Sequence, residues 1–375
     1  MSARTAVATR SLVALDIDGT LLNKAGHATK AVHDAAALAH AAGHHLVPAT
    51  GRSLVGLLTA ARTLSLTDGW AVASNGAHLV RLDPTAPGGY IAEEAHLFAP
   101  RPVIRRSQEL LGGVVVAVED VGVGWRVSRR LPDGILNGAQ TITSVADLCA
   151  TPATRVALLG PGIRRFVDAL AATGVTVTPA GSDWVDVVKL GVSKATTLEE
   201  VRRRLDVPSG STVAVGDDVN DEAMLRWAAR GVAMAHAPAR VRHAATETTG
   251  TLHDDGAATV LRSLVPEAAL DPNLSPLAAQ LAATVAAAPS TVTLRAWHGT
   301  GPALSSVTAW LLDDGEWRVH APVPAGTGAT MRGLEVAARA AGLAFPVAED
   351  APRARWRRTT LTDAPSSYEL PLWRP

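Results

Sequence analysis

An apolar run that ends in two carboxylates constrains this chain more than any other feature. The segment "LVALDIDGTLLN" covers residues 12–23, and Leu12 to Leu15 with Ile17 show no alternation of apolar and polar residues. Such a run predicts a strand that is covered on both faces, as in a parallel sheet. Asp16 and Asp18 then lie at the carboxyl end of the strand. That end is the edge where open α/β sheets bind ligands.

The residues that follow alternate between strand and helix patterns. Two further strands are expected at residues 45–51 and 69–77, and helices at 28–43 and 53–64. A βαβαβ order of this kind predicts an α/β fold with a doubly wound parallel sheet. The same alternation returns later in the chain. A helix is expected at 193–206, a strand at 211–218, a helix at 220–231, a strand at 232–236 and two further short helices that end near residue 265.

The pattern predicts three structural parts in a chain of 375 residues. Residues 10–78 and 186–265 are expected to form a Rossmann-like core, interrupted by an inserted α+β cap domain at 79–185. A linker and helix at 266–290 lead to a small C-terminal α+β domain at 291–375, whose role is unknown. Within that domain, Asp314-Gly315 lies between apolar runs and predicts a hairpin.

Composition narrows the classes of function. Lys plus Arg and Asp plus Glu number 35 each, so the formal net charge is zero and nothing global attracts nucleic acid or an anionic membrane. The single cysteine, Cys149, excludes an internal disulfide framework. The first ten residues lack a signal-peptide pattern, and the longest apolar stretch is too short to span a bilayer. We therefore expect a cytoplasmic protein with no membrane segment.

Four polar clusters fall at predicted strand ends or at a helix start. They are Asp16 with Asp18, the segment Thr50-Gly51-Arg52, Lys194, and the acidic segment "VGDDVNDEAM" with Asp217, Asp218, Asn220 and Asp221. A doubly wound sheet would bring them to one edge. Carboxylates grouped with a lysine and a hydroxyl group imply a hard cation and an anionic substrate, because carboxylates alone would repel both each other and a phosphate.

Taken together, these motifs resemble those of the haloacid dehalogenase superfamily phosphatases. Asp16 to Thr20 resembles the first family motif, Thr50 to Arg52 the second, "GVSKATTL" around Lys194 the third, and "GDDVNDEAML" the fourth. One large insertion between the second and third motifs, preceded by "SNGA" at residues 74–77, resembles the Cof-type or class IIB branch. The resemblance covers roughly residues 10–265, and the remaining residues lie outside it.

The resemblance implies a role for each matched residue. Asp16 would be the nucleophile that forms an aspartyl-phosphate, and Asp18 the general acid and base. Mg²⁺ would be held by Asp16, the backbone carbonyl of Asp18, and Asp217, with Asp221 as a ligand or its support. The expected phosphate-binding residues are Thr50, Gly51, Lys194 and Asn220. Candidates for substrate contact or loop support are Arg52, Asn75, Asp218 and Lys189. Lys189 is also the alternative to Lys194 as the lysine of the third motif.

These expectations predict a Mg²⁺-dependent phosphatase that acts on a small phosphorylated metabolite, such as a sugar phosphate. The cap would close over the site and exclude water. One alternative is phosphoryl transfer of the class IIB phosphomutase type, which needs a second phosphate pocket. Another is a ligand-sensing or binding protein, in which the C-terminal domain recruits a protein or ligand partner. The sequence leaves the substrate, the oligomeric state and the specificity residues of the cap open.

Overall fold

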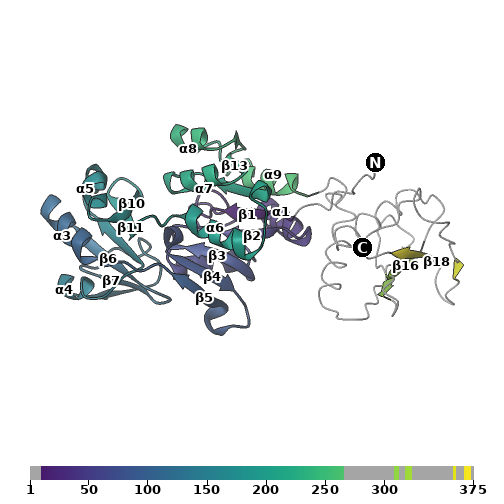
Figure 1. The fold of residues 1–375 in the computed structure, drawn as a ribbon, viewed down its shortest axis with the longest axis horizontal. Helices are drawn as coiled ribbons and strands as arrows, with labels where there is room; N and C mark the ends of the chain where they lie inside the picture. The colour runs from purple at the N-terminus through teal and green to yellow at the C-terminus, as the bar shows by residue number, and fades with distance from the viewer. Residues whose placement is uncertain (1–9, 266–307, 312–316, 323–357, 360–366, 373–375) are drawn as a thin grey trace. The chain divides into compact units, whose positions relative to one another are not determined.

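The computed structural model describes residues 10–265, 308–311, 317–322, 358–359 and 367–372. The described residues group into two compact units. The first holds residues 10–34 and 44–260 (Figure 1), and the second holds residues 35–43 and the described residues after 260. The candidate site lies within the first unit.

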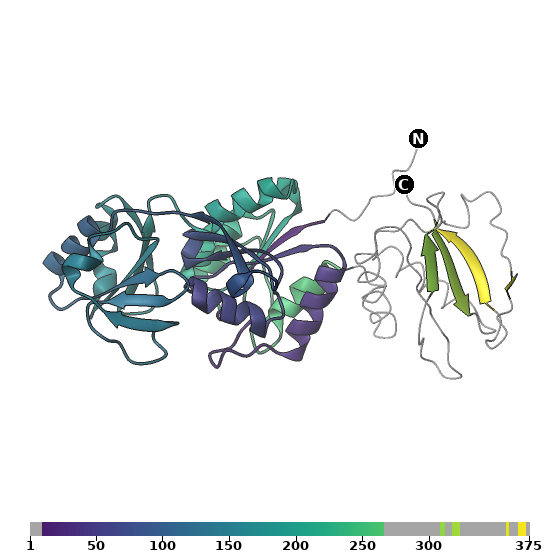
Figure 2. The same ribbon diagram turned by 90° about the horizontal axis from the view of Figure 1, so that it is seen from below.

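A five-stranded parallel sheet forms the centre of the first unit. Its strand order is β14-β13-β12-β1-β2, and every neighbouring pair is parallel. The strands are β1 (Leu12–Leu15), β2 (His45–Pro48), β12 (Thr212–Gly216), β13 (Arg230–Ala233) and β14 (Glu247–Thr248). Helices lie on both faces of this sheet (Figure 2). The predicted doubly wound α/β fold is confirmed.

Six helices connect or follow these strands. They are α1 (Lys30–Ala41), α2 (Leu54–Thr63), α6 (Lys194–Arg204), α7 (Glu222–Trp227), α8 (Ala239–Ala244) and α9 (Gly256–Ser263). The start of α6 is defined by the side chain of Ser193, which accepts a hydrogen bond from Thr196 N, while the Thr196 hydroxyl oxygen accepts from Ser193 N. This capping box places Lys194 in the first helical position.

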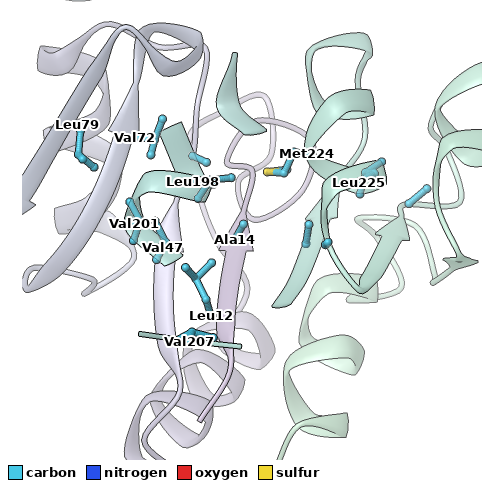
Figure 3. Packing of buried hydrophobic residues seen from close by; sticks show 14 of the residues in the cluster. Leu12, Ala14, Val47, Val72, Leu79, Leu198, Val201, Val207, Met224 and Leu225 are labelled. Atoms are coloured by element: carbon cyan, nitrogen blue, oxygen red, sulfur yellow. The ribbon is translucent and has the colours of Figure 1, made fainter. Parts of the chain in front are cut away.

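Apolar side chains from both helices and strands cover one face of the sheet. Leu12 and Ala14 of β1 and Val47 of β2 pack with Leu198 and Val201 of α6 (Figure 3). Met224 and Leu225 of α7 belong to the same cluster. Because all four residues of β1 are buried, the strand is held on both faces and its carboxyl end is rigid.

The strand predicted at 69–77 does not continue the parallel ladder. β3 (Gly69–Ala73) pairs antiparallel with β4 (His78–Leu82), and β4 with β5 (Tyr90–Ala95), in a separate three-stranded sheet. Only an isolated parallel bridge, Ala49 to Val72, joins β3 to the segment after β2. The tight turn Ser74–Gly76 reverses the chain directly after β3, so that β3 and β4 form an antiparallel hairpin.

The inserted domain contains a six-stranded sheet of order β10-β11-β9-β6-β7-β8. Its strands are β6 (Val115–Asp120), β7 (Gly124–Val127), β8 (Ala139–Ile142), β9 (Arg155–Leu159), β10 (Val175–Pro179) and β11 (Trp184–Lys189). Its helices are α3 (Arg101–Leu110), α4 (Val145–Leu148) and α5 (Val167–Ala171). Valine and leucine residues of β6, β9 and β11 pack with side chains from these helices in a core of their own.

The boundaries of this insertion differ from the sequence expectation of 79–185. Residue 79 falls inside the β3–β4 hairpin, and residue 185 falls inside β11. Strand pairing places residues up to Ala95 in the three-stranded sheet β3-β4-β5, and residues up to Lys189 in the six-stranded sheet of the insertion. Both differences arise because cross-strand partners, which are set by register, decide where a sheet ends.

The second unit contains a four-stranded antiparallel sheet of order β15-β16-β18-β17. The strands are β15 (Thr308–Leu311), β16 (Trp317–Pro322), β17 (Arg358–Thr359) and β18 (Ser367–Leu372). Antiparallel pairing of β15 with β16 agrees with the hairpin predicted at Asp314-Gly315, although that turn lies outside the described residues. The predicted linker and helix at 266–290 also lie outside them. Among the described helices, none is long and apolar enough to cross a membrane.

Replacing Leu198 by alanine should destabilise the first unit, because the fully buried side chain would leave a cavity between α6 and β1. We expect a loss of about 2–5 kcal/mol in the free energy of unfolding, measured by urea denaturation. Leu190→Ala is the matched control, since Leu190 is 65% exposed, and should change this free energy by less than about 0.5 kcal/mol. Equal effects of the two substitutions would contradict the packing described here.

Candidate active site

The first cluster begins where β1 ends. Asp16 N donates to Val215 O at 3.0 Å, so the chain stays aligned with β12 as it leaves the sheet. The side chain of Asp16 is 6% exposed and that of Asp18 is 54% exposed. Gly19 has φ +84°, and a Cβ at this position would lie 2.3 Å from Asp217 Oδ2. A glycine is therefore required for the close approach of the two acidic loops.

Lys194 connects two of the acidic side chains. Its Nζ donates to Asp16 Oδ1 at 2.6 Å and to Asp221 Oδ1 at 2.7 Å, and its side chain is fully buried. Burial alone would lower the pKa of Lys194, but the two carboxylates raise it above its ordinary value. The pKa of Asp16 is also raised, because burial and the charge of Asp221 outweigh the attraction of Lys194. Lys194 is therefore charged, within a cluster that carries excess negative charge.

The acidic loop after β12 is shaped by Asp221. Asp221 Oδ2 accepts hydrogen bonds from the backbone N–H of Asp217 at 3.0 Å and of Asp218 at 3.1 Å. Asp217 Oδ1 in turn accepts from Thr20 Oγ1 at 3.0 Å. Gly216 permits this turn, because a Cβ there would lie 2.5 Å from Asp221 Cγ. One carboxylate thus organises the loop while its other oxygen bonds to Lys194.

These acidic residues suit a divalent cation. Asp16, Asp217 and Asp221 each offer one oxygen atom, and these atoms lie within 4.8 Å of one another. Oxygen donors from carboxylates are the preferred ligands of hard cations such as Mg²⁺. The surplus of negative charge left by a single lysine gives a second reason for a cation here. The Asp18 side chain does not join this set.

Asp18 is held instead by Arg52. Arg52 Nε donates to Asp18 Oδ2 at 2.7 Å, and Nη2 donates to Oδ1 at 2.6 Å. The bidentate pair joins the loop after β1 to the loop after β2. Hydrogen bonding to Asp18 raises the pKa of Arg52. Both side chains border the same cavity.

The loop after β2 also contacts Asn75 and Asn220. Buried Thr50 donates its N–H to Val72 O at 2.9 Å, and its Oγ1 accepts from Arg52 N at 3.1 Å. Gly51 lies against the two amides, since a Cβ there would be 3.1 Å from Asn75 Oδ1 and 3.2 Å from Asn220 Nδ2. Asn220 Nδ2 donates to Asn75 Oδ1 at 3.0 Å. Predicted residues from the second and fourth motifs therefore lie side by side.

A cavity of about 220 Å³ opens between these loops and the inserted domain. Its core side includes Asp16, Asp18, residues 50–53, Asp218 and Asn220. The inserted domain contributes Trp125, Leu136, Asn137, Arg155, Trp184 and Asp186, among others. The cavity is large enough for a small molecule and combines indole rings with charged and amide groups.

Lys189 and Asp218 take less central positions than the cluster around Lys194. Lys189 is the exposed last residue of β11, whereas Lys194 is buried on Asp16. Asp218 begins the short helix Val219–Asp221, where its Oδ1 accepts from Val219 N at 2.7 Å, and it borders the cavity.

Sequence reasoning missed the charged pair of the inserted domain. Arg155 donates to both oxygens of Asp186, with Nη2 at 2.7 Å from each, and its guanidinium lies 5.1 Å from the ring centroid of Trp125. Trp184 Nε1 also donates to Asp186 Oδ1 at 2.9 Å. The available signal was a single charged residue inside each of two apolar strand patterns, "TRVALL" and "WVDVV".

Comparison with known proteins gives one family and several relatives. A model of the haloacid dehalogenase-like hydrolases matches residues 13–87 and 162–261. The 5-amino-6-(5-phospho-D-ribitylamino)uracil phosphatase YitU of Bacillus subtilis is 24% identical over 265 residues, which are 67% of this chain and 96% of that protein. The putative phosphatase YxeH of the same organism is 24% identical over 278 residues, 68% of this chain and 98% of its own length.

Solved structures show the same fold. The phosphatase BT1666 of Bacteroides thetaiotaomicron superposes with a TM-score of 0.59 at 24% identity, over 70% of this chain and 98% of that structure. The subclass IIB sugar phosphatase BT4131 superposes with a TM-score of 0.58 at 21% identity, over 68% of this chain and 98% of that structure. The likeness confirms the fold class and the presence of a cap domain.

The stability of the metal-free protein should depend on the ionisation of Asp217. Burial, together with the charge of Asp221, raises the pKa of Asp217 from 3.8 to about 6. Because the folded state then binds the proton more tightly than the unfolded state does, this residue costs stability as the pH rises from about 4 through about 6. We expect Asp217→Asn to stabilise the metal-free protein at pH 8 by up to about 3 kcal/mol, and to have little effect at pH 4.

Chemical denaturation in EDTA at both pH values measures this difference. Asp34→Asn is the control, because the Asp34 side chain is 49% exposed and pairs with Lys30 on the surface of α1. A benefit of Asp217→Asn that is equal at pH 4 and pH 8 would show that Asp217 is not under electrostatic strain in the folded protein.

Proposed function

We propose that this chain, a phosphomonoesterase of the haloacid dehalogenase-like hydrolases, hydrolyses a small phosphorylated metabolite, with Asp16 as nucleophile and Mg²⁺ as cofactor. The observation that carries the proposal is the buried Lys194, whose Nζ lies 2.6 Å from Asp16 Oδ1 and 2.7 Å from Asp221 Oδ1. A fixed cation beside a buried carboxylate that lines a cavity suits attack on an anionic phosphoryl group.

Asp16 and Asp18 divide the chemistry between them. A carboxylate oxygen of Asp16 forms a bond to phosphorus while the bond from phosphorus to the leaving oxygen breaks, which yields an aspartyl-phosphate. For this step Asp18 must carry a proton, with one of its oxygens released from Arg52, and it donates that proton to the leaving oxygen. It then accepts a proton from the water that attacks the phosphorus atom and releases phosphate. The rigid strand β1, which directly precedes Asp16, supports its role as nucleophile. The role of Asp18 is supported by its position at the same cavity as Asp16.

Asp16, Asp217 and Asp221, together with the backbone carbonyl of Asp18, are the proposed ligands of Mg²⁺. When bound, the cation would lower the repulsion between these carboxylates and the phosphoryl oxygens. Among the protein groups, Lys194 holds a phosphoryl oxygen and adds the positive N-terminal end of α6. Thr50, Gly51 and Asn220 hold the remaining oxygens, in keeping with their contacts around the loop after β2.

The substrate side of the cavity suits a small polar molecule. The inserted domain lines it with the ion pair of Arg155 and Asp186 and with the indole rings of Trp125 and Trp184. We propose a sugar phosphate or a similar polyol phosphate as substrate. The compound in the name of YitU contains a phosphorylated ribityl chain and a uracil ring, so it belongs in the first substrate panel.

Phosphomutase-type transfer and a binding function of the C-terminal domain are the competing interpretations from the sequence. A partner for that domain and a cytoplasmic location also stay predictions.

Replacing Asp16 by asparagine should abolish phosphate release, because an amide cannot attack phosphorus as a carboxylate does. We expect kcat/KM to fall by at least about 10³-fold. Phosphate release is measured on sugar, polyol and nucleotide monophosphates. Asp168→Asn, a change at an exposed position of α5, is the control and should leave turnover unchanged. Activity that survives in Asp16→Asn would refute the assignment of the nucleophile.

Removing divalent cations should stop turnover without unfolding the protein. We expect EDTA to suppress phosphate release by at least about 10²-fold, and added Mg²⁺ to restore it, because the carboxylate cluster otherwise repels the substrate. Circular dichroism in parallel monitors the fold. Full activity in EDTA would contradict a metal requirement, and transfer of phosphate to a second sugar without release to water would favour the mutase.

A further inference from the structure

The turn Ser74–Gly76 joins parts of the molecule that are far apart in the sequence. All three residues have positive φ, with 53° at Ser74, 55° at Asn75 and 100° at Gly76. Left-handed backbone is unfavourable for residues other than glycine and persists only when the surroundings impose it. Here the surroundings are the loop after β2, the start of α6, the acidic loop and the inserted domain.

Backbone contacts fix the turn to the core. Ser74 N donates to Arg52 O at 2.8 Å, and Asn75 N donates to Thr50 O at 3.1 Å. On its other side, Thr197 Oγ1 of α6 donates to Gly76 O at 2.8 Å. The turn is thus tied to the second-motif loop and to the helix that carries Lys194.

Two buried carboxylates of the inserted domain bind consecutive residues of the same turn. Glu119 of β6 accepts from Ser74 Oγ at 2.6 Å, and also from Leu54 N at 3.0 Å at the start of α2. Asp186 of β11 accepts from Asn75 Nδ2 at 3.1 Å. Although burial opposes ionisation of Glu119, His78, Arg155 and Ser74 lower its pKa.

The contact with Asp186 determines the orientation of the Asn75 side-chain amide. An ionised carboxylate only accepts hydrogen bonds, so Asn75 must present its NH₂ group to Asp186 and its Oδ1 to the opposite side. Asn220 Nδ2 donates to that Oδ1 at 3.0 Å. Asn220 therefore uses one N–H on Asn75 and keeps the other for a phosphoryl oxygen. Without Asn75, its amide could rotate and present a carbonyl oxygen to the phosphate.

We propose that Asn75 is a positioning residue, which couples the inserted domain to the transfer site by linking Asp186 to Asn220. This role rests on the proposed function of Asn220 as a phosphate-binding residue. It differs from direct substrate contact, because Asn75 is 4% exposed and both ends of its amide are already bonded to protein. In this arrangement a displaced inserted domain releases Asn75, and the Asn220 amide then loses its orientation.

Asn75→Gly is the sharpest test, since glycine accepts the positive φ and the substitution removes only the amide. We expect kcat to fall by about tenfold or more with little change in KM, as for other residues that orient a binding group. In the Asn220→Ala background the same change should have almost no further effect. Asp186→Asn should lower kcat in the same direction and combine non-additively with Asn75→Gly.

Ser65→Gly is the matched control, because Ser65 is an exposed residue with φ 56° remote from this relay. It should leave kcat and KM unchanged. Wild-type kcat in Asn75→Gly, an increase in KM alone, or full additivity with Asn220→Ala would overturn the inference.

Hydrogen exchange tests the coupling independently of turnover. Relative to wild type and Ser65→Gly, Asn75→Gly should speed amide exchange in residues 217–221 and in β11. Unchanged exchange in both segments would overturn the inference even if the enzyme is active. If Asn75→Gly speeds exchange in both segments but the wild-type protein releases no phosphate, the coupling is supported and the proposed function is refuted.

Discussion

The buried ammonium group of Lys194 is the interaction on which the rest of the site depends. It lies between Asp16 and Asp221, with Asp217 close by, and both its partners are buried. Burying charge is costly unless each charge is paired, and one lysine cannot balance three carboxylates. The cluster therefore calls for a further cation, whose charge would also let an anionic substrate approach. Charges that the fold holds in place can stabilise the negative charge of a transition state without having to reorganise.

The parallel sheet makes this cluster possible. β1 and β12 are neighbours in register, so the residues that follow them meet at one edge although they are far apart in the chain. Gly19 then allows the loops after β1 and β12 to approach more closely than a Cβ would permit, and Gly216 allows Asp221 to fold back against the end of β12. Rigid strands behind the loops keep the carboxylates in place when their mutual repulsion would separate them.

A second set of buried charges connects the inserted domain to this edge. Glu119 and Asp186 each accept a hydrogen bond from a side chain of the turn Ser74–Gly76. Arg155 forms an ion pair with Asp186 and lies over the ring of Trp125. Such ion pairs add little net stability, but they are specific in geometry, and removing one partner leaves a buried charge. Contacts from the core and from the inserted domain thus hold the strained turn in place. In our proposal, residues next to this turn bind the phosphate.

The apolar run before Asp16, the helix that begins near residue 193 and the clusters around Thr50, Lys194 and Asp217 could be predicted from the sequence, because each is a local pattern. The doubly wound fold of the core could be predicted from the order of those patterns. Antiparallel pairing of β3 could not be predicted, since it depends on three positive φ angles in a turn whose residues permit other conformations. Tertiary structure alone decided the pair Arg155–Asp186, because the register between β9 and β11 brings the two residues together. It also decided the link through Asn75 to Asn220, because the contact between the inserted domain and the core joins residues that no sequence spacing relates.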